Sequence, residues 1–209
     1  MTRHTQHLAS IATIAVAALA LSGCQSAGSG TPTATASTST PATSASPTAT
    51  STPTPTASPE EVAIAAAEKK IPEYFAVADR SLQDPDTFKL DDFKGVAISS
   101  ALVDLENRFS VFTGQMLTQT GAAKVESIEN PRVALEFDLE KSPPDVPTVQ
   151  LDVCVDVSKI NMVNEAGESQ IPATRAPRQL WRIGVSNYEY PSPDDWRVSF
   201  TDTQGGKTC

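Results

Sequence analysis

Thr148–Val157 (TVQLDVCVDV) is the stretch that decides the fold, because it alternates apolar and polar side chains along its whole length. Every second residue is aliphatic, which is the spacing of a β-strand with one buried face. That face carries Val149, Leu151, Val153, Val155 and Val157. The opposite face carries Asp152, Cys154 and Asp156, and the stretch therefore predicts a strand in a sheet covered on one side only.

Other strand-like segments surround this one. The strands that we expect are Lys124–Ile128, Val133–Glu140, Ile160–Val163, Gln179–Tyr190 and Trp196–Thr203. The segments between them are rich in turn residues: Pro143-Pro144, Asn164–Gly167 and Ser192-Pro193-Asp194. The second half of the chain is thus predicted to be a run of short antiparallel strands.

A long helix is predicted before the strands. Ser58, Pro59 and Glu61 form a capping box with proline at the first helical position, which is a strong helix start. Apolar residues continue at helical spacing through Ile71, Tyr74, Phe75, Ala78 and Leu82. Pro72 is expected to kink this helix or to begin a second segment, and Asp84-Pro85-Asp86 to end it.

Two more helices are expected before the first strand. A short one covers Leu90–Val96, and a longer one carries an apolar stripe at 4-3-4-3-4 spacing. The stripe consists of Ile98, Leu102, Leu105, Phe109, Phe112 and Met116. It favours a core-facing side over a partner-binding surface, and Gly121 is predicted to cap the helix. Helices followed by strands predict an α+β fold with N-terminal helices packed on a curved antiparallel sheet.

The element order and three short segments resemble the NTF2-like (SnoaL-like, cystatin-like cone) domain of actinobacterial lipoproteins. The segments are Val149–Asp156, Glu165-Ala166-Gly167, and Trp196-Arg197-Val198 followed by Cys209. The resemblance covers residues 59–209 and implies a pocket between the sheet and the helices. Ketosteroid isomerases of this superfamily use an aspartate base with a tyrosine donor there, whereas many relatives only bind ligands or partners.

The resemblance raises the question of an acid–base pair. Tyr74 with Asp138, Asp152 or Asp156 is the candidate pair, although each carboxylate also fits a solvated strand face. No residue matches a family catalytic motif, so no catalytic residue is assigned. The leading hypothesis is a non-enzymatic domain that binds a protein, a cell-wall component or a small apolar ligand. The alternatives are a ketosteroid-isomerase-like enzyme and a structural module that forms a homodimer through its open sheet face.

Charge and histidine content narrow the chemistry of residues 59–209. This part holds 15 basic and 25 acidic side chains, a net charge of −10, which disfavours nucleic acid and anionic lipid as partners. Both histidines, His4 and His7, precede it. Ser-His-Asp and Cys-His nucleophile systems and histidine-ligated metals are therefore excluded from this domain, and we expect no metal or cofactor.

Two of the three cysteines are expected to pair. Cys154 and Cys209 form an even pair in a compartment that the N-terminus predicts to be oxidising, so a disulfide is expected. Closing a loop of this length stabilises by roughly 4 kcal/mol at most in the chain-entropy model. A thiol nucleophile is the alternative, but the domain has no histidine to activate it.

The N-terminus predicts export and lipid attachment. Ile11–Leu21 is uncharged but, at 11 residues, too short to span a bilayer, and it is typical of a secretory signal. Leu21-Ser22-Gly23-Cys24 resembles a bacterial lipobox, which implies cleavage of residues 1–23 and a diacylglyceryl group on Cys24. Two acyl chains anchor stably where one holds marginally. The alternative is an ordinary secretory signal with a coincidental cysteine.

Residues 24–58 are predicted to be a disordered tether. Gln25–Ser58 contains no charged or aromatic residue and is built almost entirely from Ser, Thr, Ala, Pro and Gly. The same composition is typical of O-glycosylated stalks, which are the alternative interpretation of this segment. The sequence thus predicts a domain displayed at the extracytoplasmic face of a bacterial cell membrane.

Overall fold

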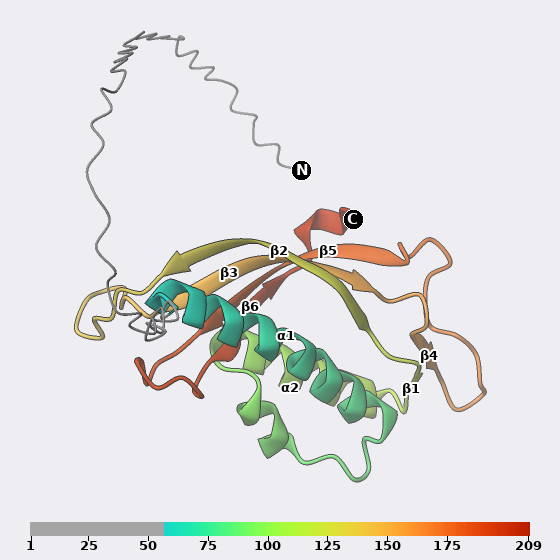
Figure 1. The fold of residues 1–209 in the computed structure, drawn as a ribbon. Coiled ribbons are helices and arrows are strands. Elements are labelled where there is room, and N and C mark those ends of the chain that lie inside the picture. Colours follow the sequence, from blue (N-terminus) through green and yellow to red (C-terminus); the bar gives the residue numbers. More distant parts are fainter. Residues whose placement is uncertain (1–56) are drawn as a thin grey trace, which may run out of the picture. The chain divides into compact units, whose positions relative to one another are not determined.

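The computed structural model describes residues 57–209, which form a curved antiparallel sheet with helices packed against one face (Figure 1). Cys24, the signal segment 1–23 and the tether up to residue 56 lie outside the described residues. The sheet has four strands in the order β2-β3-β5-β6. Their bounds are Lys124–Ala134 (β2), Thr148–Asp156 (β3), Arg178–Ser186 (β5) and Arg197–Asp202 (β6). The predicted α+β class is confirmed.

β3 is an inner strand whose aliphatic face forms the centre of the core. Four of its side chains are completely buried: Val149, Leu151, Val153 and Val155. β3 pairs along its whole length with β5, from Thr148 opposite Ser186 to Asp156 opposite Arg178. On its other side it pairs with β2. The alternation in the sequence therefore identified the strand and its buried face, and its end to within one residue.

α1 spans Pro59–Gln83 and begins at the predicted capping box. The Glu61 amide donates to the Ser58 hydroxyl at 3.2 Å, and the Ser58 amide donates to the Glu61 carboxylate at 2.7 Å. The helix continues through Pro72 as one element instead of starting a second segment there. Pro72 and Glu68, four residues earlier, are both exposed, so water can replace the backbone bond that proline cannot make.

The predicted stripe faces the core except at its last residue, Met116, which is 60% exposed because the helix ends earlier than predicted. A 3-10 helix, η1, covers Leu90–Gly95, and α2 covers Ser99–Gly114. Met116 follows in the left-handed region, with φ of 51°. The Leu117 amide donates to the Phe112 carbonyl and the Met116 amide to the Thr113 carbonyl, which is a Schellman motif. The prediction that Gly121 caps this helix is therefore wrong.

Gly121 has a different role, in the turn between β1 (Thr118–Thr120) and β2. Its φ is 71°, and a Cβ at this position would lie 1.9 Å from the Lys159 carbonyl oxygen. Glycine is needed here because the chain takes a left-handed conformation while passing close to another backbone segment.

The predicted strands Lys124–Ile128 and Val133–Glu140 are one strand, β2, interrupted by two register shifts. Pro131 lies within it, as is allowed on an edge strand. β2 ends at Ala134, so residues 135–140 do not form the predicted strand. Phe137 and Leu139 are exposed in the following loop, by 43% and 53%, because no strand pairs there to bury them.

A separate two-stranded ribbon lies beyond one end of the sheet (Figure 1). The predicted strand at Ile160–Val163 is present as β4 (Asn161–Val163), but its partner is β1 and not the main sheet. The pairing is antiparallel, with Gln119 opposite Met162. The ribbon forms a side wall for the space beneath the sheet.

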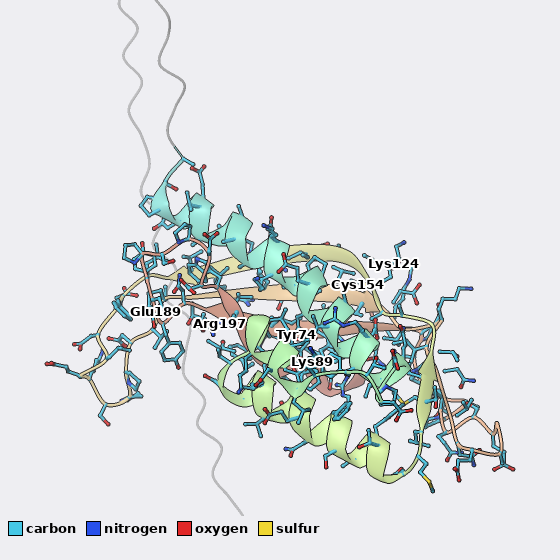
Figure 2. The ribbon with its side chains drawn as sticks, turned by 90° about the horizontal axis from the view of Figure 1, so that it is seen from below. Tyr74, Lys89, Lys124, Cys154, Glu189 and Arg197 are labelled. Carbon is cyan, nitrogen blue, oxygen red and sulfur yellow. A yellow bond between two sulfur atoms is a disulfide. The ribbon has the colours of Figure 1, made fainter. Side chains whose placement is uncertain are left out.

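The predicted disulfide between Cys154 and Cys209 is confirmed, with 5.9 Å between the two Cα atoms. Cys154 lies on the face of β3 turned away from the helices (Figure 2). The chain after β6 forms a short 3-10 helix, Gln204–Gly206, and the Leu180 amide of β5 then donates to the Lys207 carbonyl. The disulfide thus fastens the C-terminal segment to the sheet.

Among the described residues, no helix combines the length and the apolar character that crossing a bilayer requires.

Candidate ligand-binding pocket

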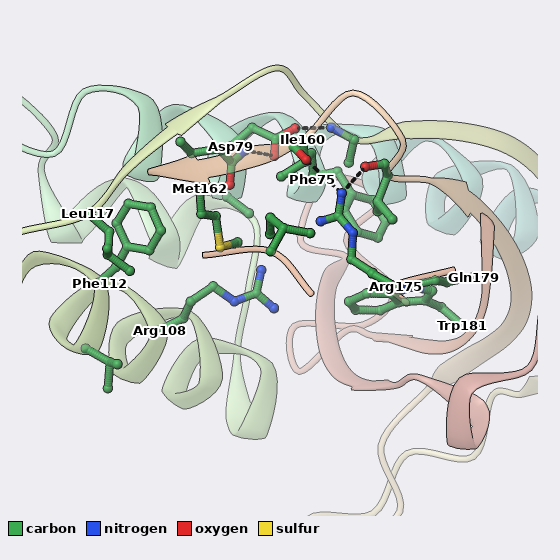
Figure 3. Close-up of a pocket in the computed structure, with 16 residues that line it drawn as sticks. Phe75, Asp79, Arg108, Phe112, Leu117, Ile160, Met162, Arg175, Gln179 and Trp181 are labelled. Atoms are coloured by element: carbon green, nitrogen blue, oxygen red, sulfur yellow. Dashed lines mark hydrogen bonds between the residues drawn. The ribbon is translucent and has the colours of Figure 1, made fainter. Parts of the chain in front are cut away.

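A pocket of about 430 Å³ opens between the C-terminal halves of α1 and α2, the β1–β4 ribbon and the start of β5 (Figure 3). This volume is within the range of small-molecule sites, roughly 300–1,000 Å³. Eleven of its lining residues are apolar: Phe75, Ala78, Val111, Phe112, Leu117, Ala123, Val157, Ile160, Met162, Ile171 and Trp181. Five are polar or charged: Asp79, Arg108, Gln119, Arg175 and Gln179.

The helix end and the core of the domain fix the apolar wall. The Schellman motif turns the chain so that Phe112 and Leu117, its characteristic apolar pair, both line the pocket. From α1 and β5, Phe75 and Trp181 meet edge to face with ring centroids 5.5 Å apart. The Trp181 indole donates to the Gln179 amide oxygen at 3.3 Å. The wall is thus held by contacts that exist without a ligand.

Asp79 is a buried carboxylate that joins the ribbon to α1. It accepts a hydrogen bond from the Gln119 side-chain amide at 2.7 Å and another from the Ala123 backbone amide at 2.8 Å. Burial raises the pKa of Asp79, and the bonds from Ala123 and Gln119, together with the Arg108 charge, oppose that rise. The two bonds use one carboxylate oxygen each, so this side chain holds the pocket wall together.

Arg175 fastens the loop between β4 and β5 to the end of β3. Its guanidinium donates to the carbonyls of Val157 and Ile160, both at 2.7 Å (Figure 3). The loop carries Ile171 to the pocket as well. Because carbonyls carry no net charge, these bonds orient Arg175 without neutralising it.

Arg108 extends from α2 toward the middle of the pocket (Figure 3). It is exposed, and within residues 57–209 its side chain has neither a hydrogen bond nor a carboxylate at salt-bridge distance. Its charge reaches Tyr74 and Asp79 and offsets part of the rise that burial causes in the pKa of each. Arg108 is thus a cation at an apolar pocket whose donors are free for a ligand.

The carboxylates considered in the sequence lie away from this pocket. Asp152 is on the opposite face of the sheet, 3.4 Å from Arg182 and 3.5 Å from Arg132. Partial burial raises the pKa of Asp152. Hydrogen bonds from Asn130 and Arg182, together with the charges of Arg132 and Arg182, lower it by more, so the net shift is downward. Asp156 is on the same outer face, where the Ser158 amide lowers its pKa. Asp138 lies in the loop after β2.

Tyr74 is buried between α1, α2 and β6 and does not line the pocket. Burial raises its pKa, while Arg108 and the Thr201 hydroxyl oppose the rise. All three tyrosines of the chain are among the described residues, and none lines the pocket. The structure therefore does not bring Tyr74 together with Asp138, Asp152 or Asp156.

The open face of the sheet is polar. Register places these charged side chains on it: Lys124, Glu129, Arg132, Asp152 and Arg182. The large apolar side chains that residues 57–209 expose lie on helices and in loops instead, including Val103, Val111 and Phe137. Within the described part of the chain, the sheet face that the homodimer hypothesis invokes thus carries many charged side chains.

The sequence analysis did not select Asp79 or Arg108, although a signal for Asp79 was present. Asp79 lies four residues after Phe75 and eight after Ile71, on the buried side of α1. Arg108, by contrast, is exposed on α2 and lies next to Phe109, which keeps the apolar stripe of that helix unbroken. A charged residue that interrupts an apolar helical stripe indicates a polar group facing the interior. Arg175 lies in a loop without regular spacing and gave no such signal.

Comparison with known proteins gives no functional guide. No family model matches the chain, and no curated protein matches it. Among solved structures, the intermembrane space region of the chloroplast protein ARC6 is similar over 65% of this chain and 92% of that one. The TM-score is 0.41 and the sequence identity 9%, a likeness too distant to carry an argument. Within residues 57–209, no cluster of three or more His, Cys, Asp or Glu side chains is placed to hold a metal ion.

Proposed function

We propose that this protein is a membrane-anchored extracytoplasmic lipoprotein whose NTF2-like domain binds a small, largely apolar ligand and does not catalyse a reaction. One observation carries the binding half of the proposal: an open pocket of about 430 Å³ with eleven apolar lining residues. Apolar pockets with a few oriented polar groups are the usual form of small-molecule sites. The anchoring half rests on the lipobox-like segment ending at Cys24 and the uncharged tether after it.

The state of the pocket carboxylate favours binding over acid–base chemistry. A general base needs an oxygen directed at the substrate proton. Both oxygens of Asp79 accept hydrogen bonds from the fold, one from Gln119 and one from Ala123. The Asp–Tyr arrangement of ketosteroid isomerases would also need a tyrosine in the pocket wall, and Tyr74 lies behind it. The polar groups therefore hold the wall of a ligand-binding pocket in place.

Binding by apolar contact is tested with uncharged ligands of increasing chain length. Primary alcohols from hexan-1-ol to decan-1-ol are titrated into the purified protein by calorimetry. Each added methylene that enters the pocket contributes ~0.8 kcal/mol, so the affinity should rise about fourfold per carbon until the pocket is full. Absence of binding throughout the series would sink the proposal.

A pair of substitutions on α2 locates the binding. Val111 lines the pocket and is 59% exposed, so Val111→Trp adds bulk at the opening without overfilling the core. Val103 is 52% exposed on the same helix but does not line the pocket, and Val103→Trp is its matched control. We expect Val111→Trp to weaken decan-1-ol binding at least about tenfold and Val103→Trp to leave it unchanged. Equal effects would place binding elsewhere.

A further inference from the structure

We infer that the pocket selects ligands with a single carboxylate, which Arg108 binds while the apolar body contacts the apolar wall. The inference rests on the proposed binding function and adds the chemical class of the ligand. It is carried by the position of Arg108, by the charges around the pocket and by the size of the apolar space.

The packing of α2 directs the Arg108 side chain into the pocket. Leu105 and Phe112, its neighbours three residues before and four after, are buried, so the packing of α2 fixes the side from which Arg108 projects. Asp104, one turn earlier, is the carboxylate that helical spacing brings nearest on the same helix, and it is not within 4.0 Å of Arg108. Within residues 57–209 no carboxylate therefore forms a salt bridge with the guanidinium, and Asp79 acts on it only across the pocket.

The pocket is cationic within an acidic domain. Two arginines, Arg108 and Arg175, and one carboxylate, Asp79, line it. If all three are ionised the local charge is +1, whereas residues 59–209 together carry −10. A positive site surrounded by negative surface attracts one anionic group and disfavours its binding elsewhere on the domain.

The charge of the pocket favours a carboxylate over a phosphate monoester. One carboxylate neutralises the net charge of +1, and its two oxygens match the fork of a guanidinium. A phosphate monoester carries about −1.5 to −2 at pH 7, which leaves excess negative charge beside Asp79. Arg175 does not provide a second equivalent guanidinium for a phosphate, because its Nη2 already donates to the carbonyls of Val157 and Ile160.

The test compares ligands of ten carbon atoms each. Decanoate, decan-1-ol and decyl phosphate are titrated into the purified protein and into Arg108→Gln, at neutral pH and constant ionic strength. The alkyl chain of decanoate is one methylene shorter than that of the other two, which works against the preference expected for it. We expect wild type to bind decanoate about tenfold more tightly than decan-1-ol, as a charge-assisted hydrogen bond at a partly hydrated site predicts. Arg108→Gln should lose this preference while its affinity for decan-1-ol is unchanged.

Two further variants show whether the preference for decanoate comes from a contact with Arg108 or from the overall charge of the domain. Lys69→Gln removes one positive charge from an exposed position on α1 outside the pocket, and it should leave the preference for decanoate intact. Arg108→Lys keeps the charge and should retain part of the preference.

The outcomes distinguish the two proposals. Equal binding of decanoate and decan-1-ol to wild type overturns the inference on the acid group but leaves the binding function standing. Tighter binding of decyl phosphate overturns the choice of carboxylate. Failure of all three ligands to bind overturns both proposals.

Discussion

Asp79 is a residue whose ionisation should be visible in the stability of the domain. Burial raises its pKa, so the folded chain holds this proton more tightly than the unfolded chain does. The contribution of Asp79 to the free energy of unfolding therefore falls as pH rises from the ordinary pKa of aspartate through the raised one. Urea titrations of wild type and Asp79→Asn across acidic pH should give a wild-type minus variant difference that decreases with pH.

Asp91 supplies a control of opposite sign. Its exposed carboxylate is hydrogen-bonded by Lys94, which lowers its pKa, so its contribution is lost as pH falls and gained as pH rises. The difference between wild type and Asp91→Asn should increase with pH. A flat or rising difference for Asp79→Asn would contradict the buried, ionisable role given to that side chain.

Gly121 is the second residue for which the structure predicts a specific effect of substitution on stability. Gly121→Ala brings a Cβ against the Lys159 carbonyl at a left-handed φ, whereas Gly167 has a similar φ of 80° with open space around it. Gly167→Ala should cost about 1 kcal/mol for the left-handed conformation alone. Gly121→Ala adds overpacking against backbone and should cost about 3 kcal/mol or more. Equal midpoints in denaturant for the two variants would contradict the close approach.

At the scale of single elements, the capping box is a separable contribution to α1. Ser58→Ala removes the hydroxyl that accepts from the Glu61 amide, and the free energy of unfolding should fall by about 1 kcal/mol. Ser110 is an exposed serine inside α2, so Ser110→Ala should be neutral or slightly stabilising. Thermal unfolding of both variants checks the difference, and an equal loss would argue against the cap.

The sequence predicted elements well where one local rule decides them. The α1 cap and the β3 alternation each need only neighbouring residues, and both were found correctly. The errors arose where tertiary contacts decide. The alternation around Phe137 continues past β2 without a partner strand, and Gly121 serves a close backbone approach that no local pattern shows.

At the scale of the whole molecule, the disulfide fastens the C-terminus to an inner strand. The bonded residues are 55 positions apart, and the chain-entropy model gives about 4 kcal/mol as an upper limit. Cys209 is exposed, so Cys209→Ser breaks the bond without burying a hydroxyl. Its free energy of unfolding should fall by about 2–4 kcal/mol and become insensitive to reductant. Wild type unaffected by reductant would contradict this account.

The proposed anchor predicts where the whole protein resides. Cys24→Ser removes the thiol that would carry the lipid, so the variant should leave the membrane fraction while wild type remains in it. Fractionation of the native host with an antibody to the domain measures the distribution. Cys209→Ser is the control, because it removes a cysteine and leaves the lipobox intact. Retention of Cys24→Ser in the membrane would contradict lipid anchoring.

From the sequence, the pocket could be predicted only as a feature that the family resemblance implies. The resemblance implied a space between sheet and helices, but its walls come from segments far apart in the sequence. Asp79 of α1 meets Gln119 of β1, and Arg175 of the β4–β5 loop meets Val157 at the end of β3. Such pairings depend on how the elements pack. The interrupted helical stripe at Asp79 was the one sign of this site that the sequence contained.

A nuclear magnetic resonance titration tests the central claim, that this pocket binds an apolar ligand, most directly. The chain has two tryptophans, of which Trp181 lines the pocket with its indole bonded to Gln179, while Trp196 lies outside it. On addition of decan-1-ol to the 15N-labelled protein, the Trp181 indole and the amides of the pocket wall should shift together and saturate, and the Trp196 indole should stay in place. Shifts confined to the outer face of the sheet, or none at all, would contradict the account.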